Sequence, residues 1–104
     1  MSKSLHRLTV KQIEAAAPGT ALADGGGLLY RATAKGSGKW SFKFVSPDAD
    51  FRAAQIAKGS KSFQRAMGLG AFPAVLLAAA RERAAAARDL LAKGVDPIED
   101  ERRR

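Results

Sequence analysis

Residues 25–45 read GGGLLYRATAKGSGKWSFKFV, and this stretch decides the fold. Apolar residues alternate in it with basic and hydroxyl-bearing residues, on both sides of a Gly/Ser turn. Because successive side chains of a strand point to opposite faces of a sheet, the stretch predicts a hairpin with one apolar and one polar face. The apolar face comprises Tyr30, Ala32, Trp40, Phe42 and Phe44. The polar face comprises Arg31, Thr33, Lys39, Ser41 and Lys43.

The positive charge of the chain is concentrated around this hairpin. The whole chain carries a net charge of +8, and residues 31–73 hold eight Lys and Arg against two Asp, a net of +6. A charge that serves only solubility would be spread more evenly, whereas a surface that binds a polyanion gathers its cations. We therefore interpret the polar face as a DNA-binding surface. A solvated basic surface without a ligand is the alternative.

Length and composition exclude several other classes of protein. A chain of 104 residues, 46% of them hydrophobic, fits one small domain. It has no cysteine and a single histidine, His6, so we expect no disulfide, no metal site and no cofactor. No apolar run is long enough to cross a membrane, and residues 1–6 lack the apolar region of a secretory signal. The sequence thus predicts a cytoplasmic protein.

The sequence before the hairpin predicts a helix and a short strand. Thr9 and Gln12 form a capping-box pattern at the start of a helix over residues 10–17, which a Pro-Gly pair ends. Residues 20–23 can form a brief strand, and Asp24-Gly25 after them predicts a tight turn. After the hairpin, residues 75–93 carry apolar side chains at steps of three and four, which predicts a long helix.

The connection after the hairpin is less regular. Residues 46–60 are long for a hairpin loop and predict a mobile excursion, with at most a helical turn over 51–57. A last strand is expected over residues 61–69. The predicted fold is therefore α+β, with a short N-terminal helix, a three-stranded antiparallel sheet, and a long C-terminal helix packed on one sheet face. Residues 1–97 would form this domain, and residues 98–104 a charged linker or the end of the chain.

Glycine-rich segments suggest nucleotide binding only at first sight. The GSGK segment at residues 36–39 lacks the glycine at position 33 and the hydroxyl residue at position 40 that a phosphate loop requires. The three glycines at residues 25–27 lack both the spacing and the following helix of a dinucleotide fingerprint. Since His6 and the acidic residues also lack catalytic partners, we predict that this chain performs no chemistry by itself.

A β-sheet can enter the major groove of DNA, and the polar face supplies suitable groups. Arg31 and Lys43 are candidates for guanine edges or phosphates. Lys35 and Lys39, near the turn, are better placed for phosphates, which position a protein without reading sequence. The candidate set is completed by Thr33, Ser41, Gln64 and Arg65, of which Arg65 falls on the apolar side of its strand. Trp40 is expected in the core rather than as a platform for bases.

Four motifs occur in order along the chain. They are LADGGGL at residues 22–28, GSGKWSF at 36–42, LGAFP at 69–73 and GVDP at 94–97. Together they resemble the N-terminal arm-type DNA-binding domain of tyrosine-recombinase integrases from prophages and genomic islands, over nearly the whole chain. The resemblance implies a three-stranded sheet that docks on arm-type sites. Carried onto this chain, its sheet positions are Arg31, Thr33, Ser41 and Lys43.

The resemblance also implies that DNA targeting and catalysis belong to different domains. The catalytic Arg, Lys, His and Tyr of such integrases belong to a larger C-terminal domain, so this chain is expected to be one targeting domain of an integrase, or a remnant of one. Its expected partners are double-stranded DNA and the catalytic domains of its own integrase, with no membrane and no small-molecule substrate. The chain departs from the family between the last two strands, where some fifteen residues replace a short Gly-Lys turn.

Two other functions stay open on the sequence alone. A protein–protein interaction module would use the Ala/Leu-rich helix or residues 51–56, and would associate with itself regardless of DNA. A double-stranded RNA-binding module would recognise the shape and 2′-hydroxyls of its ligand.

Overall fold

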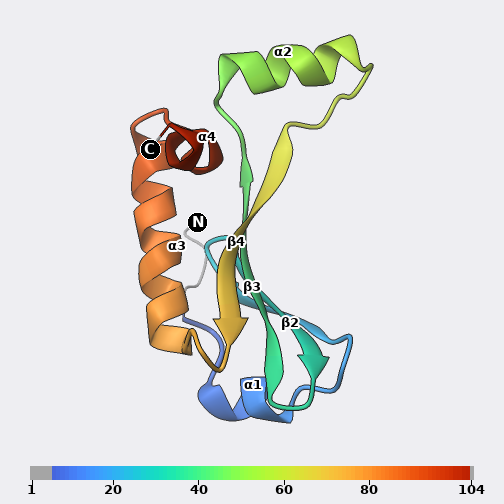
Figure 1. The fold of residues 1–104 in the computed structure, drawn as a ribbon, viewed down its shortest axis with the longest axis vertical. Helices are drawn as coiled ribbons and strands as arrows, with labels where there is room; N and C mark the ends of the chain where they lie inside the picture. Colours follow the sequence, from blue (N-terminus) through green and yellow to red (C-terminus); the bar gives the residue numbers. More distant parts are fainter. Residues whose placement is uncertain (1–5, 104) are drawn as a thin grey trace.

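The computed structural model describes residues 6–103; residues 1–5, most of the segment in which a secretory signal was sought, lie outside the described part. The fold is α+β, with a four-stranded antiparallel sheet in the order β1-β2-β3-β4 and a long helix along one of its faces (Figure 1). The strands are β1 (Ala21–Gly25), β2 (Leu28–Ala34), β3 (Ser37–Val45) and β4 (Gln64–Phe72). The helices are α1 (Val10–Ala15), α2 (Ala49–Ala57), α3 (Leu77–Ala92) and α4 (Pro97–Arg102).

The central hairpin forms as its alternation predicts. Tyr30 pairs with Trp40 and Arg31 with Lys39 across β2 and β3. All five side chains of the predicted apolar face are buried. The indole N–H of Trp40 donates a hydrogen bond to the Val75 carbonyl at 2.7 Å, so Trp40 is a core residue, as expected.

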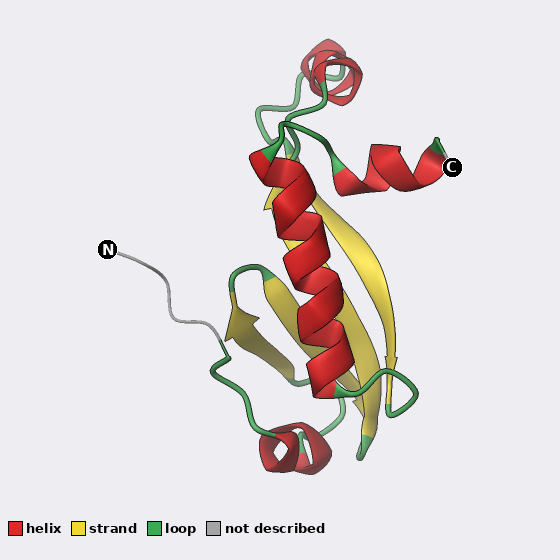
Figure 2. Ribbon diagram, turned by 90° about the vertical axis from the view of Figure 1, so that its left-hand side faces the viewer, coloured by secondary structure: helices red, strands yellow, loops and turns green. Residues whose placement is uncertain are grey.

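Helix α3 covers the apolar face of the sheet (Figure 2). Its buried stripe, Leu77, Ala80, Ala84 and Ala87, matches the predicted spacing. Small alanine side chains let the helix lie close to the strands. The helix starts without a side-chain cap and ends at Lys93, where Gly94 adopts a positive φ and its N–H donates to the Leu91 carbonyl.

The predicted capping box at the start of α1 is confirmed. The Thr9 N–H donates to the Gln12 side-chain oxygen at 2.8 Å, and the Gln12 N–H donates to the Thr9 hydroxyl at 3.2 Å. Ile13 buries its side chain fully in the core.

The sheet has four strands, not the three predicted. Residues 21–25 form a strand that pairs with β2, with Asp24 at an irregularity in the register between Ala23 and Gly25, so Asp24 and Gly25 belong to the strand and not to the turn. Gly26 and Gly27 make the turn instead, both with positive φ. A Cβ on Gly27 would lie 2.6 Å from the Lys43 carbonyl oxygen, so the hairpin requires glycine there.

The segments before and after β4 also differ from expectation. Residues 46–60 were expected to be a mobile excursion with at most a helical turn over 51–57. The helix there is longer: α2 starts at Ala49, and Asp48 caps its first turn by accepting from the Phe51 N–H at 2.9 Å. The last strand begins at Gln64 and runs to Phe72, later than predicted. Residues 97–102 form α4 rather than a linker, because Asp96 caps them and Pro97 suits a first helical position.

None of the helices in the described part of the chain combines the length and the apolar character that crossing a membrane requires.

Candidate nucleic-acid interface

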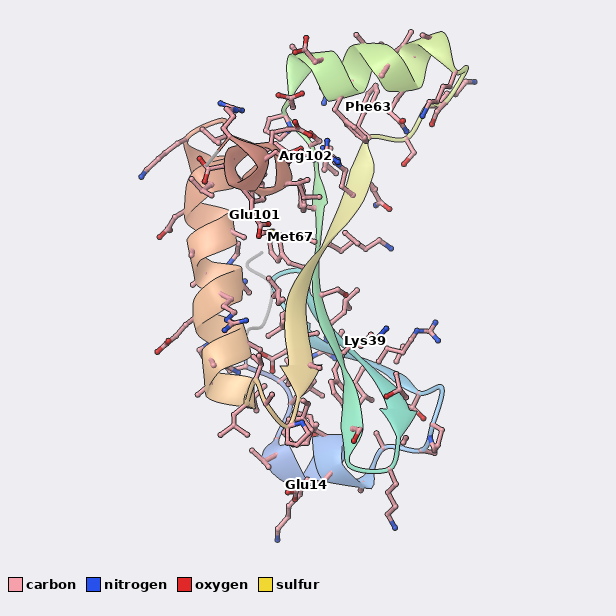
Figure 3. All side chains as sticks on the ribbon, in the orientation of Figure 1. Glu14, Lys39, Phe63, Met67, Glu101 and Arg102 are labelled. Carbon is pink, nitrogen blue, oxygen red and sulfur yellow. The ribbon has the colours of Figure 1, made fainter. Side chains whose placement is uncertain are left out.

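The sheet face opposite α3 gathers exposed cations, and we call it the basic face. Arg31 on β2 lies directly opposite Lys39 on β3, and Lys43 follows on β3, opposite Ala66 of β4. All three cations are exposed, and Figure 3 shows Lys39 pointing away from α3. No ion pair among residues 6–103 involves any of them.

The placement of these cations does not stabilise the fold. Like charges directly opposite each other across two strands are destabilising, so the Arg31–Lys39 pair costs the sheet stability. No carboxylate in the described residues offsets this cost by pairing with either side chain. An uncompensated cation pair on an exposed sheet face favours a polyanion as its partner.

Small and hydroxyl-bearing residues lie between and beside the cations. Ser41 pairs with Leu29 on one side and with Gly68 on the other. A hollow of about 340 Å³ lies over one end of the face, where Gly27 and Leu29 meet β3 at Lys43 and β4 at Gln64. Thr33 is exposed on β2, and its hydroxyl donates to the Ser37 carbonyl at 3.4 Å. These residues leave the face open to a close approach by another surface.

Seven of the eight candidate residues share this side of the molecule or its rim. Five of them lie on the face itself: Arg31, Lys39, Ser41, Lys43 and Gln64. Thr33, at a register shift near the end of β2, and Lys35, in the turn between β2 and β3, are exposed at its rim. The structure thus places on one side of the molecule seven of the residues that the alternation of side chains and the charge distribution had identified as candidates.

Arg65 is the exception, because it lies on the α4 side of β4. Its guanidinium donates to Glu99 at 2.7 Å and to Asp96 at 3.2 Å, and its side chain is only 12% exposed. The guanidinium also stacks over the Phe51 ring, 4.2 Å from its centroid. Burial alone would lower the pKa of Arg65, but its hydrogen bonds to Glu99 and Asp96, and their negative charges, outweigh burial and raise that pKa. We therefore leave Arg65 out of the interface.

A buried carboxylate, Asp24, fixes the orientation of α3. The sequence had predicted a tight turn at this residue. Asp24 is 1% exposed. The Arg81 guanidinium donates to both of its oxygens at 2.9 Å, and the Leu8 N–H donates to one at 2.8 Å. Burial would raise the pKa of Asp24, but the hydrogen bonds from Arg81 and Leu8 outweigh it and lower that pKa. The ion pair joins α3 to β1 and to the segment before α1.

A second buried carboxylate, Asp96, joins the far end of the sheet to α4. It accepts hydrogen bonds from the Ser46 hydroxyl, from Arg65, and from the Ile98 N–H at 2.7 Å. Burial opposes its ionisation, yet these donors lower the pKa of Asp96 below its ordinary value of 3.8. Asp24 and Leu22 are two residues apart on β1 and therefore point to the same, inward side, so the alternation along the strand could have shown that Asp24 is buried. No such pattern in the sequence pointed to Asp96.

The two carboxylates predict how stability depends on pH. A folded-state pKa below the unfolded value means that ionised Asp24 and Asp96 contribute stability at neutral pH, and that this contribution is lost as pH falls through the folded-state pKa. We expect the urea midpoint to change little between about pH 7 and 5 and to fall steeply below about pH 4. A midpoint that stays level down to about pH 3 would contradict this account.

Comparison with known proteins places these observations in a family. The family model for the Arm DNA-binding domain matches residues 8–104. The chain is 34% identical to an integrase of Enterobacteria phage P4 over 94 residues, which is 88% of this chain and 19% of that protein. It is 34% identical to the prophage integrase IntA of Escherichia coli K12 over 105 residues, 98% of this chain and 22% of that protein.

The chain therefore spans about a fifth of the length of these curated relatives. The resemblance inferred from the four motifs is confirmed. Because the family model covers almost the whole sequence, the chain belongs to the family of Arm DNA-binding domains.

Proposed function

We propose that this chain binds double-stranded DNA through the basic face and serves as the targeting module of a site-specific recombinase, on arm-type sites. The observation that carries the proposal is the Arg31–Lys39 pair, which lies uncompensated on an exposed sheet face with Lys43 beside it. A β-sheet fits the major groove, and the side chains of this face match the groups that a duplex offers.

The position of each residue on the face would determine which part of the DNA it contacts. Arg31 and Lys43 would contact guanine edges or phosphates, and Lys35 and Lys39 would contact the phosphate backbone. Hydrogen bonds to bases or backbone would come from Thr33, Ser41 and Gln64. The sheet contributes rigidity, since α3 and the Asp24–Arg81 pair hold its other face. The chain positions a duplex and performs no bond-making step itself.

An NMR titration of the ¹⁵N-labelled chain with duplex DNA tests this function. We expect amide shifts on the exposed sides of β2, β3 and β4, centred on Arg31, Ser41 and Lys43, with α3 unaffected. The same titration with duplex RNA separates the RNA-binding alternative, which predicts equal or larger shifts. Shifts confined to α3, or concentration-dependent shifts without nucleic acid, would support the protein–protein alternative instead.

A further inference from the structure

Helix α2 stands away from the rest of the molecule, at the far end of the β3–β4 ribbon (Figure 1). It crosses over the end of the sheet, starting near α4 and ending on the side away from α3. Figure 2, turned by 90°, shows α2 end-on above the sheet, in agreement with this direction. The C-terminal end of α2 therefore overhangs the side of the molecule to which the basic face is turned.

Helix α2 has no fully buried residue, and its contacts with the rest of the molecule are made by partly buried side chains. None of its residues is buried, and Ile56 is 64% exposed. Two cation–π contacts nevertheless fix it to the ribbon: Arg52 lies 4.1 Å over the Phe63 ring, and Arg65 lies over the Phe51 ring. The position of α2 is thus well defined without any contribution to the core.

The segment after α2, Lys58–Lys61, is ordered by its own hydrogen bonds; we call it the α2 tip. The Ser60 N–H donates to the Gln55 carbonyl at 2.9 Å, and the Gln55 side chain donates to the Ser62 carbonyl at 3.2 Å. A segment that is already ordered loses little conformational entropy when it binds a partner.

Charge is separated along α2. Its acidic residues, Asp48 and Asp50, lie at the N-terminal end near α4, and the α2 tip carries Lys58 and Lys61. Both lysines are exposed, and no ion pair within the described part of the chain includes them. The end that overhangs the basic face is therefore cationic.

We propose that the α2 tip is a second DNA contact, which holds the phosphate backbone beside the duplex segment lying on the basic face. The inference rests on the proposed function. The longest dimension of the molecule is 42 Å, and one turn of B-DNA measures roughly 34–36 Å. The basic face and the α2 tip are therefore less than this longest dimension apart, so one duplex of about 30 base pairs, roughly three helical turns, can reach both. Contacts of lysine with phosphate fix register without reading sequence.

The test is a salt titration of DNA binding by Lys58→Gln/Lys61→Gln. Fluorescence anisotropy with a labelled duplex of about 30 base pairs, roughly three helical turns, gives the affinity at each salt concentration. Each lost phosphate contact lowers the slope of log K against log salt by about 0.9, so we expect a slope smaller in magnitude by about 1.8. A slope difference of about 1.8 corresponds to a loss of affinity of roughly 60-fold at about 0.1 M salt, relative to about 1 M salt.

The matched control is Lys11→Gln/Lys93→Gln, which removes the same charge from α1 and from the end of α3 and should leave the slope unchanged. If the α2-tip variant behaves like this control while Arg31→Ala/Lys43→Ala loses affinity, the second contact is refuted and the basic face stands. If the α2-tip variant and the basic-face variant both bind as the unmodified chain does, both proposals fail.

Discussion

Arg31→Ala/Lys43→Ala is expected to lose duplex binding without losing stability. Each side chain that reads a base is worth about 1–3 kcal/mol of binding free energy, and the two residues are not directly paired, so the losses should add to about 2–6 kcal/mol. The melting temperature should stay level or rise slightly, because removing Arg31 relieves its repulsion with Lys39. Anisotropy titration and thermal melting of the same preparation measure the two effects.

The control for this variant is Lys11→Ala/Lys93→Ala, which carries the same change in net charge away from the sheet. A long-range effect of net charge would weaken both double variants equally, whereas a contact surface weakens only the first. Equal affinity of the first variant and the unmodified chain would refute DNA binding through the basic face.

Asp24→Ala is expected to destabilise the fold more than a change on the basic face. It leaves the Leu8 N–H without its acceptor, and it leaves the Arg81 guanidinium with only its hydrogen bond to the Leu8 carbonyl. Breaking a buried ion pair costs 3–5 kcal/mol, and we expect about 3 kcal/mol, since Arg81 is 24% exposed and stays partly hydrated. The melting temperature should fall by roughly 10–20 °C. Urea unfolding and calorimetry measure the loss.

Asp89→Ala provides the comparison, since Asp89 is an exposed acid on α3 and its removal should change stability by no more than about 0.5 kcal/mol. Asp24→Asn should be milder than Asp24→Ala, because the amide oxygen still accepts one hydrogen bond. If Asp24→Ala unfolds at the same urea concentration as Asp89→Ala, the ion pair does not hold α3 in place.

The parts of the fold that were predictable rest on local patterns. The hairpin and both of its faces follow from a period of two, and α1 follows from a capping box that joins residues three apart. The choice of Arg31 and Lys43 needed only that alternation and the distribution of charge. Each of these patterns can be recognised from the residues of one or two neighbouring secondary-structure elements.

The parts that were missed depend on partners far along the chain. Arg81 lies fifty-seven residues after its partner Asp24, and Asp96 lies thirty-one residues after its partner Arg65. No local sequence pattern therefore shows that either ion pair forms. Helix α2 has no buried stripe by which periodicity could reveal it. Its stability comes from its cap and from stacking on rings and guanidinium groups that lie in other segments.

Arg65 contacts two helices at once, α2 and α4. One side of its guanidinium lies on the ring of Phe51 in α2, while its N–H groups are held by Glu99 in α4 and by Asp96 just before it. A displacement of either helix would therefore disturb contacts that hold the other. If α2 contacts DNA as proposed, Arg65 is the side chain through which that contact would reach α4.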